Sequence, residues 1–279
     1  MIIPFAKMSG AGNTFVLIDN RQQLVEQALA DAELSLDRFV LHFCSPVYGA
    51  ATDGLILVEH AAEHDFAWRF FNADGSHANM CGNGARCAAR FAEMVGAGGA
   101  EQAFETGAGI IHATVAGDRV RVDLTAPGPV TLGIELKLDG QRLTCHQVDT
   151  GVPHLVLPVP SVRGVDIDRL GRAARFDKRF APEGTNVNFA SLDDDGTLRV
   201  RTYERGVEGE TLACGTGVTA AAIVFSELNL TASPVTVMPL SGEALTVRFD
   251  GAEGDYRNAS ITGPARVLFR GQMETEALG

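Results

Sequence analysis

Cys81-Gly82-Asn83-Gly84 and Cys214-Gly215-Thr216-Gly217 are two copies of one short pattern, a cysteine followed by Gly-x-Gly. Their spacing is close to half of the 279-residue length. Each copy precedes an alanine-rich segment, 85–89 in the first half and 218–222 in the second. Such a repeat predicts a duplicated domain, with one cysteine in each copy placed where a glycine turn leads into a helix.

Short apolar and alternating segments predict a chain that is rich in β-strands. Residues 66–70 carry an aromatic side chain at every second position, which is typical of one face of a sheet. The other predicted strands are 54–58, 110–115, 120–124, 134–138, 155–159, 186–192, 198–203, 235–238, 245–249 and 265–269. The predicted helices are 36–43, 83–95, 166–174 and 216–228.

The order of these elements is strands, helix, strands in each half, without regular βαβ alternation. We therefore expect an α+β fold of two pseudo-symmetric domains, each a mostly antiparallel sheet wrapped around a central Ala-rich helix. Alanine suits such a helix because its small side chain lets strands approach from all sides. The junction between the halves is expected near residues 117–128.

The charge balance excludes several kinds of partner. A formal net charge of −12 and a pI near 5.0 argue against nucleic acid and against an anionic membrane surface. No apolar run approaches the roughly 18 residues of a membrane-spanning helix, and the first residues do not form a signal peptide. We expect a cytoplasmic protein with reduced thiols.

The cysteine count argues against disulfides and structural zinc. Five cysteines are present, and no two of them form a CxxC pair. Cys44, Cys87 and Cys145 are interpreted as packing residues within a helix or a strand. The sequence offers no metal-ligand cluster and no lysine in a context that compels a Schiff base, so we predict neither a metal nor a cofactor.

The two remaining cysteines suit proton transfer. The first turn of a helix has free N–H donors and a partial positive charge, which bind a carboxylate and favour a thiolate. Two such turns that faced each other would hold one carboxylate and place a sulfur on each side of its α-carbon. This arrangement predicts an acid and a base on opposite faces of one stereocentre.

Polar segments precede both cysteines at the ends of predicted strands. They are Asn72-Ala73-Asp74-Gly75-Ser76 and Tyr203-Glu204-Arg205-Gly206. Together with Lys7-Met8-Ser9-Gly10-Ala11-Gly12-Asn13 and the two cysteine patterns, these segments resemble the signatures of diaminopimelate epimerase. The resemblance runs from the first predicted strand to the last.

The resemblance implies a pyridoxal-independent enzyme that interconverts LL- and meso-diaminopimelate, in the biosynthesis of lysine and peptidoglycan precursors. It also implies a homodimer and a C-terminal strand that returns to the first domain. The implied domains are 1–120 plus 264–279, which contains Cys81, and 121–263, which contains Cys214.

The resemblance further implies a set of site residues. Cys81 and Cys214 would be the acid–base pair, and Gly82, Asn83, Gly215 and Thr216 would offer backbone amides to the reacting carboxylate. The residues that would hold the other amino and carboxylate groups are Asn13, Asn72, Asn186, Glu204 and Arg205. His154 matches a histidine near the family's site, although a histidine in a Pro-rich turn is as often structural.

The sequence departs from the family pattern at Ser9 and Thr14, where the family often has His and Asp, and at Val152, where many members carry Asn. Three rival functions stay open. A proline or hydroxyproline racemase of the same architecture would also pair two cysteines. A thiol redox protein would use Cys81 and Cys214 as a reversible disulfide, and a binding protein would hold amino acids without exchanging the α-proton.

Overall fold

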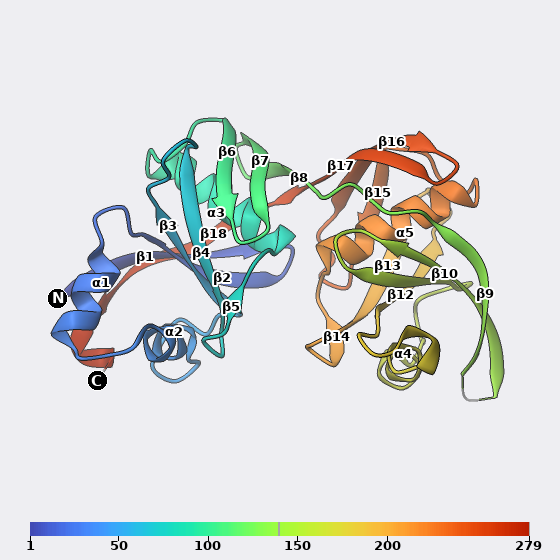
Figure 1. Cartoon of the computed structure of the whole chain (residues 1–279), viewed down its shortest axis with the longest axis horizontal. Helices are drawn as coiled ribbons and strands as arrows, with labels where there is room; N and C mark the ends of the chain where they lie inside the picture. Colours follow the sequence, from blue (N-terminus) through green and yellow to red (C-terminus); the bar gives the residue numbers. More distant parts are fainter. Residues whose placement is uncertain (139, 279) are drawn as a thin grey trace. The chain divides into compact units, whose positions relative to one another are not determined.

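The computed structural model describes residues 1–138 and 140–278, shown in Figure 1. The chain forms two compact units. Unit 1 is Met1–Val122 with Pro264–Gly279, and unit 2 is Asp123–Gly263. The sequence-based boundaries lie within two residues of this division. The assignment of the two units as epimerase-like domains stays a prediction.

The strands of unit 1 form one mixed sheet in the order β18–β1–β2–β3–β4–β6–β7–β8, and β5 also pairs with β4. The strands are β1 (Ile2–Gly10), β2 (Asn13–Asp19), β3 (Gly54–Glu59), β4 (Phe66–Asn72), β5 (His77–Ala78), β6 (Glu101–Thr106), β7 (Gly109–Ala116), β8 (Arg119–Asp123) and β18 (Arg266–Glu274). The helices are α1 (Leu24–Asp31), α2 (Leu36–Cys44), α3 (Gly82–Met94) and the 3₁₀ helix η2 (Thr275–Leu278).

The strands of unit 2 follow the order β9–β10–β11–β12–β13–β15–β16–β17, and β14 also pairs with β13. They are β9 (Thr131–Leu138), β10 (Gln141–Asp149), β11 (Pro153–Pro158), β12 (Asn186–Leu192), β13 (Leu198–Glu204), β14 (Gly209–Thr211), β15 (Val235–Met238), β16 (Leu245–Ala252) and β17 (Asp255–Pro264). The helices are α4 (Ile167–Arg175), the 3₁₀ helix η1 (Lys178–Phe180) and α5 (Gly215–Glu227).

The two sheets repeat one topology. In unit 1 the pairs β2/β3 and β4/β6 are parallel, and the other pairs are antiparallel. In unit 2 the parallel pairs are β11/β12 and β13/β15, at the same places in the strand order. The prediction of a duplicated, mostly antiparallel α+β fold is therefore confirmed.

A small-residue helix lies inside each sheet. Helix α3 packs against β1, β2, β3 and β7, and α5 packs against β10, β11, β12, β13, β15 and β16 (Figure 1). The apolar side chains on these helices that are fully buried are Ala85, Cys87, Ala88, Ala89 and Ala92 in α3 and Val218, Ala220, Ala221, Ala222, Ile223 and Val224 in α5. Short side chains let the strands pack close to the helix on several sides, which explains the alanine-rich pattern.

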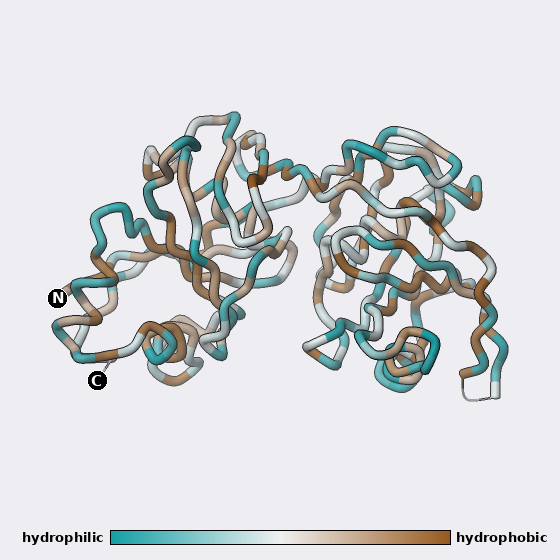
Figure 2. The backbone as a smooth tube through the Cα atoms, in the orientation of Figure 1, coloured by the Kyte–Doolittle hydropathy of each residue, from teal (hydrophilic) through white to brown (hydrophobic). Residues whose placement is uncertain are grey.

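A second core covers the outer face of each sheet. In unit 1, Phe39 and Phe43 of α2 pack on Leu55 and Leu57 of β3. In unit 2, the residues packed under α4 are Leu155, Leu157, Val187, Phe189 and Tyr203. Figure 2 shows the apolar stretch of β3 running into the more hydrophilic loop before β4. Side chains of the central strands therefore alternate between the outer core and the central helix.

Helix boundaries differ slightly from the predictions. Helices α3 and α5 begin at Gly82 and Gly215, one residue earlier than predicted, because the carbonyls of Cys81 and Cys214 already accept the first helical hydrogen bonds. Gly96, with φ +68°, follows α3 in the left-handed conformation that glycine commonly adopts at the end of a helix. Helix α1 and strands β1, β2, β5, β6, β14 and β17 are not among the elements that the sequence pattern predicts.

Candidate functional site

Each Gly-x-Gly cysteine is the N-cap of the central helix in its unit. Cys81 and Cys214 have extended backbones, with φ −148° and −111°. Their carbonyls accept hydrogen bonds from the N–H groups of Ala85, at 2.8 Å, and Val218, at 2.9 Å. The backbone N–H groups of a first helical turn have no acceptor within the helix, and they lie at the positive end of the helix dipole, so they favour a nearby negative charge. The local geometry therefore suits a reactive thiol and a bound carboxylate.

In unit 1, two of the predicted site residues are in direct contact. Asn83 is 2% exposed, and its Nδ2 donates to Oδ1 of Asn13 at 2.5 Å. Asn13 begins β2, Gly54 begins β3 and Asn72 ends β4, so these residues lie at the same end of adjacent strands. The first turn of α3 packs on this sheet, since a Cβ at Gly84 would lie 3.2 Å from Cδ1 of Ile56.

In unit 2, the other predicted residues gather in the same way. Asn186 begins β12, and its Oδ1 accepts from the backbone N–H of Arg205 at 2.8 Å. Glu204 ends β13, and its Oε2 accepts from the hydroxyl of Thr211 at 2.9 Å. Burial raises the pKa of Glu204, against the smaller lowering effect of the Thr211 hydrogen bond. Asn186 and Glu204 thus occupy the positions in unit 2 that Gly54 and Asn72 occupy in unit 1, and Arg205 directly follows Glu204.

A buried polar network supports the second cysteine. His154 and Asn188 are both fully buried, and Nδ2 of Asn188 lies 3.1 Å from Nδ1 of His154. The same amide nitrogen donates to the carbonyl of Leu155, and Thr202 donates to Oδ1 at 2.9 Å. A Cβ placed on Gly217 would overlap this Oδ1 and lie 3.3 Å from Sγ of Cys214. The network therefore sets the position of the helical turn that carries Cys214.

Sequence reasoning missed Asn188, Thr202 and Arg86 as parts of these sites. The signal was present, because Asn186-Val187-Asn188 places two amides on one face of an otherwise apolar strand. Thr150 was also missed, and its hydroxyl donates to the carbonyl of Thr216 at 3.0 Å, which anchors the first turn of α5.

The buried histidine predicts a specific pH dependence of stability. Burial, assisted by the nearby Arg205 charge, lowers the pKa of His154 to about 3. In the unfolded chain the His154 imidazole takes up a proton near pH 6.5, whereas in the folded chain it stays neutral at that pH. His154 therefore subtracts stability as the pH falls below about 6.5, with a slope of about 1.4 kcal/mol per pH unit.

We expect the free energy of unfolding of the wild type, minus that of His154→Gln, to fall between pH 6.5 and 4. Urea unfolding at a series of pH values measures this difference. A difference that does not change with pH would mean that His154 is protonated in the folded protein.

The five thiols differ in their expected reactivity. Cys81 is partly exposed and Cys214 is 8% exposed, whereas Cys87 and Cys145 are fully buried and Cys44 is 4% exposed. Burial raises the pKa of Cys44 to about 11 and that of Cys145 to about 12. The thiolate is the reactive form, so these two buried thiols react slowly.

We expect iodoacetamide at pH 8 to alkylate Cys81 first and Cys214 second in the native protein. Peptide mass spectrometry over time measures the order. Cys44, Cys87 and Cys145 should react only after unfolding. Labelling of Cys145 in the native protein at the rate of Cys81 would contradict the expected order of thiol reactivity.

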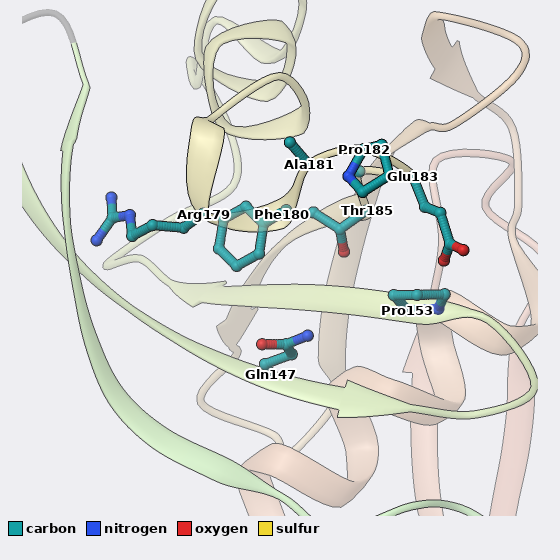
Figure 3. Close-up of a pocket in the computed structure, with 9 residues that line it drawn as sticks. Gln147, Pro153, Arg179, Phe180, Ala181, Pro182, Glu183 and Thr185 are labelled. Atoms are coloured by element: carbon teal, nitrogen blue, oxygen red, sulfur yellow. The ribbon is translucent and has the colours of Figure 1, made fainter.

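A cavity of about 230 Å³ in unit 2 is separate from the Cys214 region. Figure 3 shows Gln147 and Pro153 on the strand side of this cavity, with Phe180 and Thr185 on the other side. Gln147 pairs with Leu155 and so lies on the α4 face of the sheet, opposite to the face of His154. The cavity therefore belongs to the outer layer rather than to the cysteine site.

Metal-ligating side chains do not cluster in residues 1–138 and 140–278. Within that range, no group of three or more His, Cys, Asp and Glu side chains is arranged to hold a metal ion. The helices of this described part are too short or too polar to cross a membrane.

Comparison with known proteins identifies the family. The family model described as diaminopimelate epimerase matches residues 5–130 and 146–268. A diaminopimelate epimerase from Aquifex aeolicus is 46% identical over 279 residues, which cover 98% of this chain and 99% of that protein. One from Archaeoglobus fulgidus is 42% identical and covers 100% of this chain and 99% of its own length.

Solved structures share the fold at low sequence identity. A phenazine biosynthesis protein of the PhzF family from Bacillus anthracis has a TM-score of 0.72 at 15% identity, over 98% of this chain and 99% of its own. A probable proline racemase from Agrobacterium radiobacter K84 has a TM-score of 0.70 at 17% identity, over 99% and 96%. With full-length relatives above 40% identity and a family model that covers most of its residues, this chain belongs to the diaminopimelate epimerase family.

Proposed function

We propose that this protein interconverts LL- and meso-2,6-diaminopimelate, without a cofactor, by a two-base transfer of the α-proton between Cys81 and Cys214. The observation that carries this proposal is the equivalence of the two cysteines. Each is the N-cap of the central helix in one of two units with the same topology. Membership of the diaminopimelate epimerase family supports diaminopimelate as the proposed substrate.

The proposed reaction moves one proton on each face of the α-carbon. A thiolate takes the α-proton, and the electron pair of the broken C–H bond stays on the α-carbon and its carboxylate. The opposite cysteine, as a thiol, then donates its proton to the other face. The two cysteines exchange protonation states, so the reverse reaction uses them in swapped roles.

The helix N-termini are proposed to stabilise the carbanion. Charge develops on the carboxylate oxygens, and the backbone amides of Gly82, Asn83, Gly215 and Thr216 would donate to them. Preorganised donors of this kind contribute about 2.7–4 kcal/mol each in other enzymes. Since the amides are fixed by the helices, they need no rearrangement during the reaction.

The remaining groups are proposed to hold the rest of the substrate. Arg205 suits a carboxylate, which it binds through two parallel N–H donors, and Glu204 suits an ammonium group. Asn13, Asn72 and Asn186 would complete the contacts, with His154 in a supporting role. A place in lysine and peptidoglycan precursor synthesis follows from this substrate. The homodimer and the cytoplasmic location stay predictions.

The test is turnover of pure LL-diaminopimelate in D₂O under reducing conditions. We expect meso-diaminopimelate with deuterium at the inverted centre, measured by NMR or mass spectrometry. Product that keeps its original hydrogen would rule out two separate bases. L-Proline and trans-4-hydroxy-L-proline serve as comparison substrates, and inversion of these alone would replace the proposal with the racemase alternative.

A further inference from the structure

Arg86 is a fully buried cation one turn after Cys81, and neither the sequence pattern nor the proposed reaction gave it a role. Its Nη1 donates to the carbonyl of Gly82 at 3.1 Å, and its Nη2 donates to Oδ1 of Asn83 at 2.7 Å. Its Nε lies 3.5 Å from the carbonyl of Pro264. The guanidinium is thus bound to the same helical turn that carries the first cysteine.

The guanidinium determines the direction of the next hydrogen bond. An arginine side chain only donates hydrogen bonds, so the group of Asn83 that faces it must be the amide oxygen. The NH₂ group of Asn83 therefore points the other way, and it donates to Oδ1 of Asn13 at 2.5 Å. Asn13 in turn must use its oxygen here.

The hydrogen bonds from Arg86 to Asn83 and from Asn83 to Asn13 leave the NH₂ group of Asn13 as a donor. Because Oδ1 of Asn13 accepts from Asn83, the Nδ2 of Asn13 is directed away from it, and it makes no hydrogen bond to residues 1–138 or 140–278. Asn13 is half-buried at the start of β2, so this NH₂ group is accessible to a ligand. An NH₂ group binds a carboxylate oxygen and cannot bind an ammonium group.

In the described part of unit 2, the start of α5 has no buried cation equivalent to Arg86. Thr219 occupies the position in α5 that Arg86 occupies in α3, and its hydroxyl donates to the carbonyl of Gly215 at 2.9 Å. Thr216 stands in the place of Asn83, and a hydroxyl donates or accepts as its surroundings require. Among the described residues at the starts of α3 and α5, a buried cation orients side-chain amides only at α3, where Arg86 orients Asn83 and Asn13.

We propose that Arg86 is a positioning residue that orients Asn83 and, through it, Asn13, so that Asn13 presents an N–H donor to a carboxylate of the substrate. This inference rests on the proposed function for the identity of the substrate. Arg86 itself is buried and does not touch the substrate.

The test uses two variants, each made in the wild type and in Asn13→Ala. Arg86→Met removes the cation, so that Asn83 is free to turn over. Asn83→Asp keeps the shape and the contact with Arg86, but a carboxylate cannot donate to Asn13, and Asn13 must then present its oxygen to the substrate. Arg86→Lys, which keeps a donor, is the conservative variant.

We expect Arg86→Met and Asn83→Asp to lower kcat/KM by about 10- to 100-fold in the wild type, mainly through KM, and by less than about 3-fold in Asn13→Ala. Arg86→Lys should restore part of the loss. Equal losses in both backgrounds would overturn the proposal, since a purely structural role does not depend on Asn13. If Arg86→Met does not fold, the proposal is tested with Asn83→Asp alone, by comparing its loss of kcat/KM in the wild type with its loss in Asn13→Ala.

A separate measurement distinguishes this proposal from the function. If the wild type does not turn over diaminopimelate, the proposed function is wrong. The orientation of the Asn83 side chain can still be measured without substrate. We expect hydrogen exchange of the Asn83 side-chain NH₂ group, followed by ¹⁵N NMR, to be faster in Arg86→Lys than in the wild type. Unchanged exchange would overturn the role of Arg86.

Discussion

Replacing either Cys81 or Cys214 with alanine is expected to lower kcat for epimerisation by at least about 10³-fold in both directions. The proposed mechanism needs one group to remove the proton and another to return it on the opposite face, and each cysteine serves one face. General acid–base groups contribute roughly 10²–10⁴ in rate, and alanine removes the group entirely. Turnover of LL- and meso-diaminopimelate measures the loss.

Cys145→Ala is the matched control, because it removes a thiol that is fully buried in the outer core of unit 2. It should keep wild-type kcat within about 3-fold, at some cost in stability. Circular dichroism should show that all three variants fold. Full activity in Cys81→Ala or Cys214→Ala would disprove the two-base assignment.

The same variants allow a sharper result. A protein with one remaining thiol can still remove the α-proton from its own side and return a solvent deuteron to that side. We expect each variant to exchange the α-hydrogen of only one epimer in D₂O, without inversion, and the two variants to select opposite epimers. Exchange of both epimers by one variant would show that a single thiol reaches both faces.

The second large effect is expected for Gly217→Ala. The new Cβ would overlap Oδ1 of Asn188, which is fully buried and held by Leu155 and Thr202. Asn188 is held in β12 by its buried hydrogen bonds, so the first turn of α5, which follows Cys214, must move to avoid the overlap. A displacement of about 1 Å at a reacting group costs about 10²-fold in rate, and overpacking costs about 1–3 kcal/mol in stability.

Gly84→Ala is the matched control, since Gly84 holds the equivalent position in α3. Its Cβ would lie 3.2 Å from the flexible end of Ile56 and at an ordinary van der Waals distance of 3.6 Å from Cys81 Cβ and Phe15 Cε1. Alanine favours a helix over glycine by about 1 kcal/mol. We expect nearly unchanged stability and kcat within about 5-fold. Urea unfolding and initial rates measure both variants, and equal losses in the pair would contradict the role of Asn188.

The elements with strong local patterns were predictable from the sequence. Strands β12 and β15 were predicted with their observed bounds, because turn residues delimit their apolar runs. Helices α3 and α5 followed from the Gly-x-Gly repeats. In contrast, β1 and β2 carry mixed patterns, because their residues alternate between two different cores. The two strands pair as an antiparallel hairpin with its turn at Ala11 and Gly12.

The candidate site was predictable only as far as its residue types. Cysteine, asparagine and Glu-Arg at strand and helix ends indicated the chemistry, and the structure brings Asn13 to Asn83 and Asn186 to Arg205. Interactions such as Arg86 with Asn83, or Thr202 with Asn188, depend on which side chains share a face in three dimensions. A single sequence gives no register, so it could not identify these supporting residues.

The place of β18 in the chain affects the order in which a ribosome delivers the protein. Strand β18 pairs with β1, yet residues 123–263 are synthesised between them. Unit 2 is continuous in sequence, whereas β1 emerges early and waits for its neighbour. During translation, one edge of the first sheet is thus left open until synthesis is nearly finished, and nascent chains expose it to chaperones and to other unfinished copies.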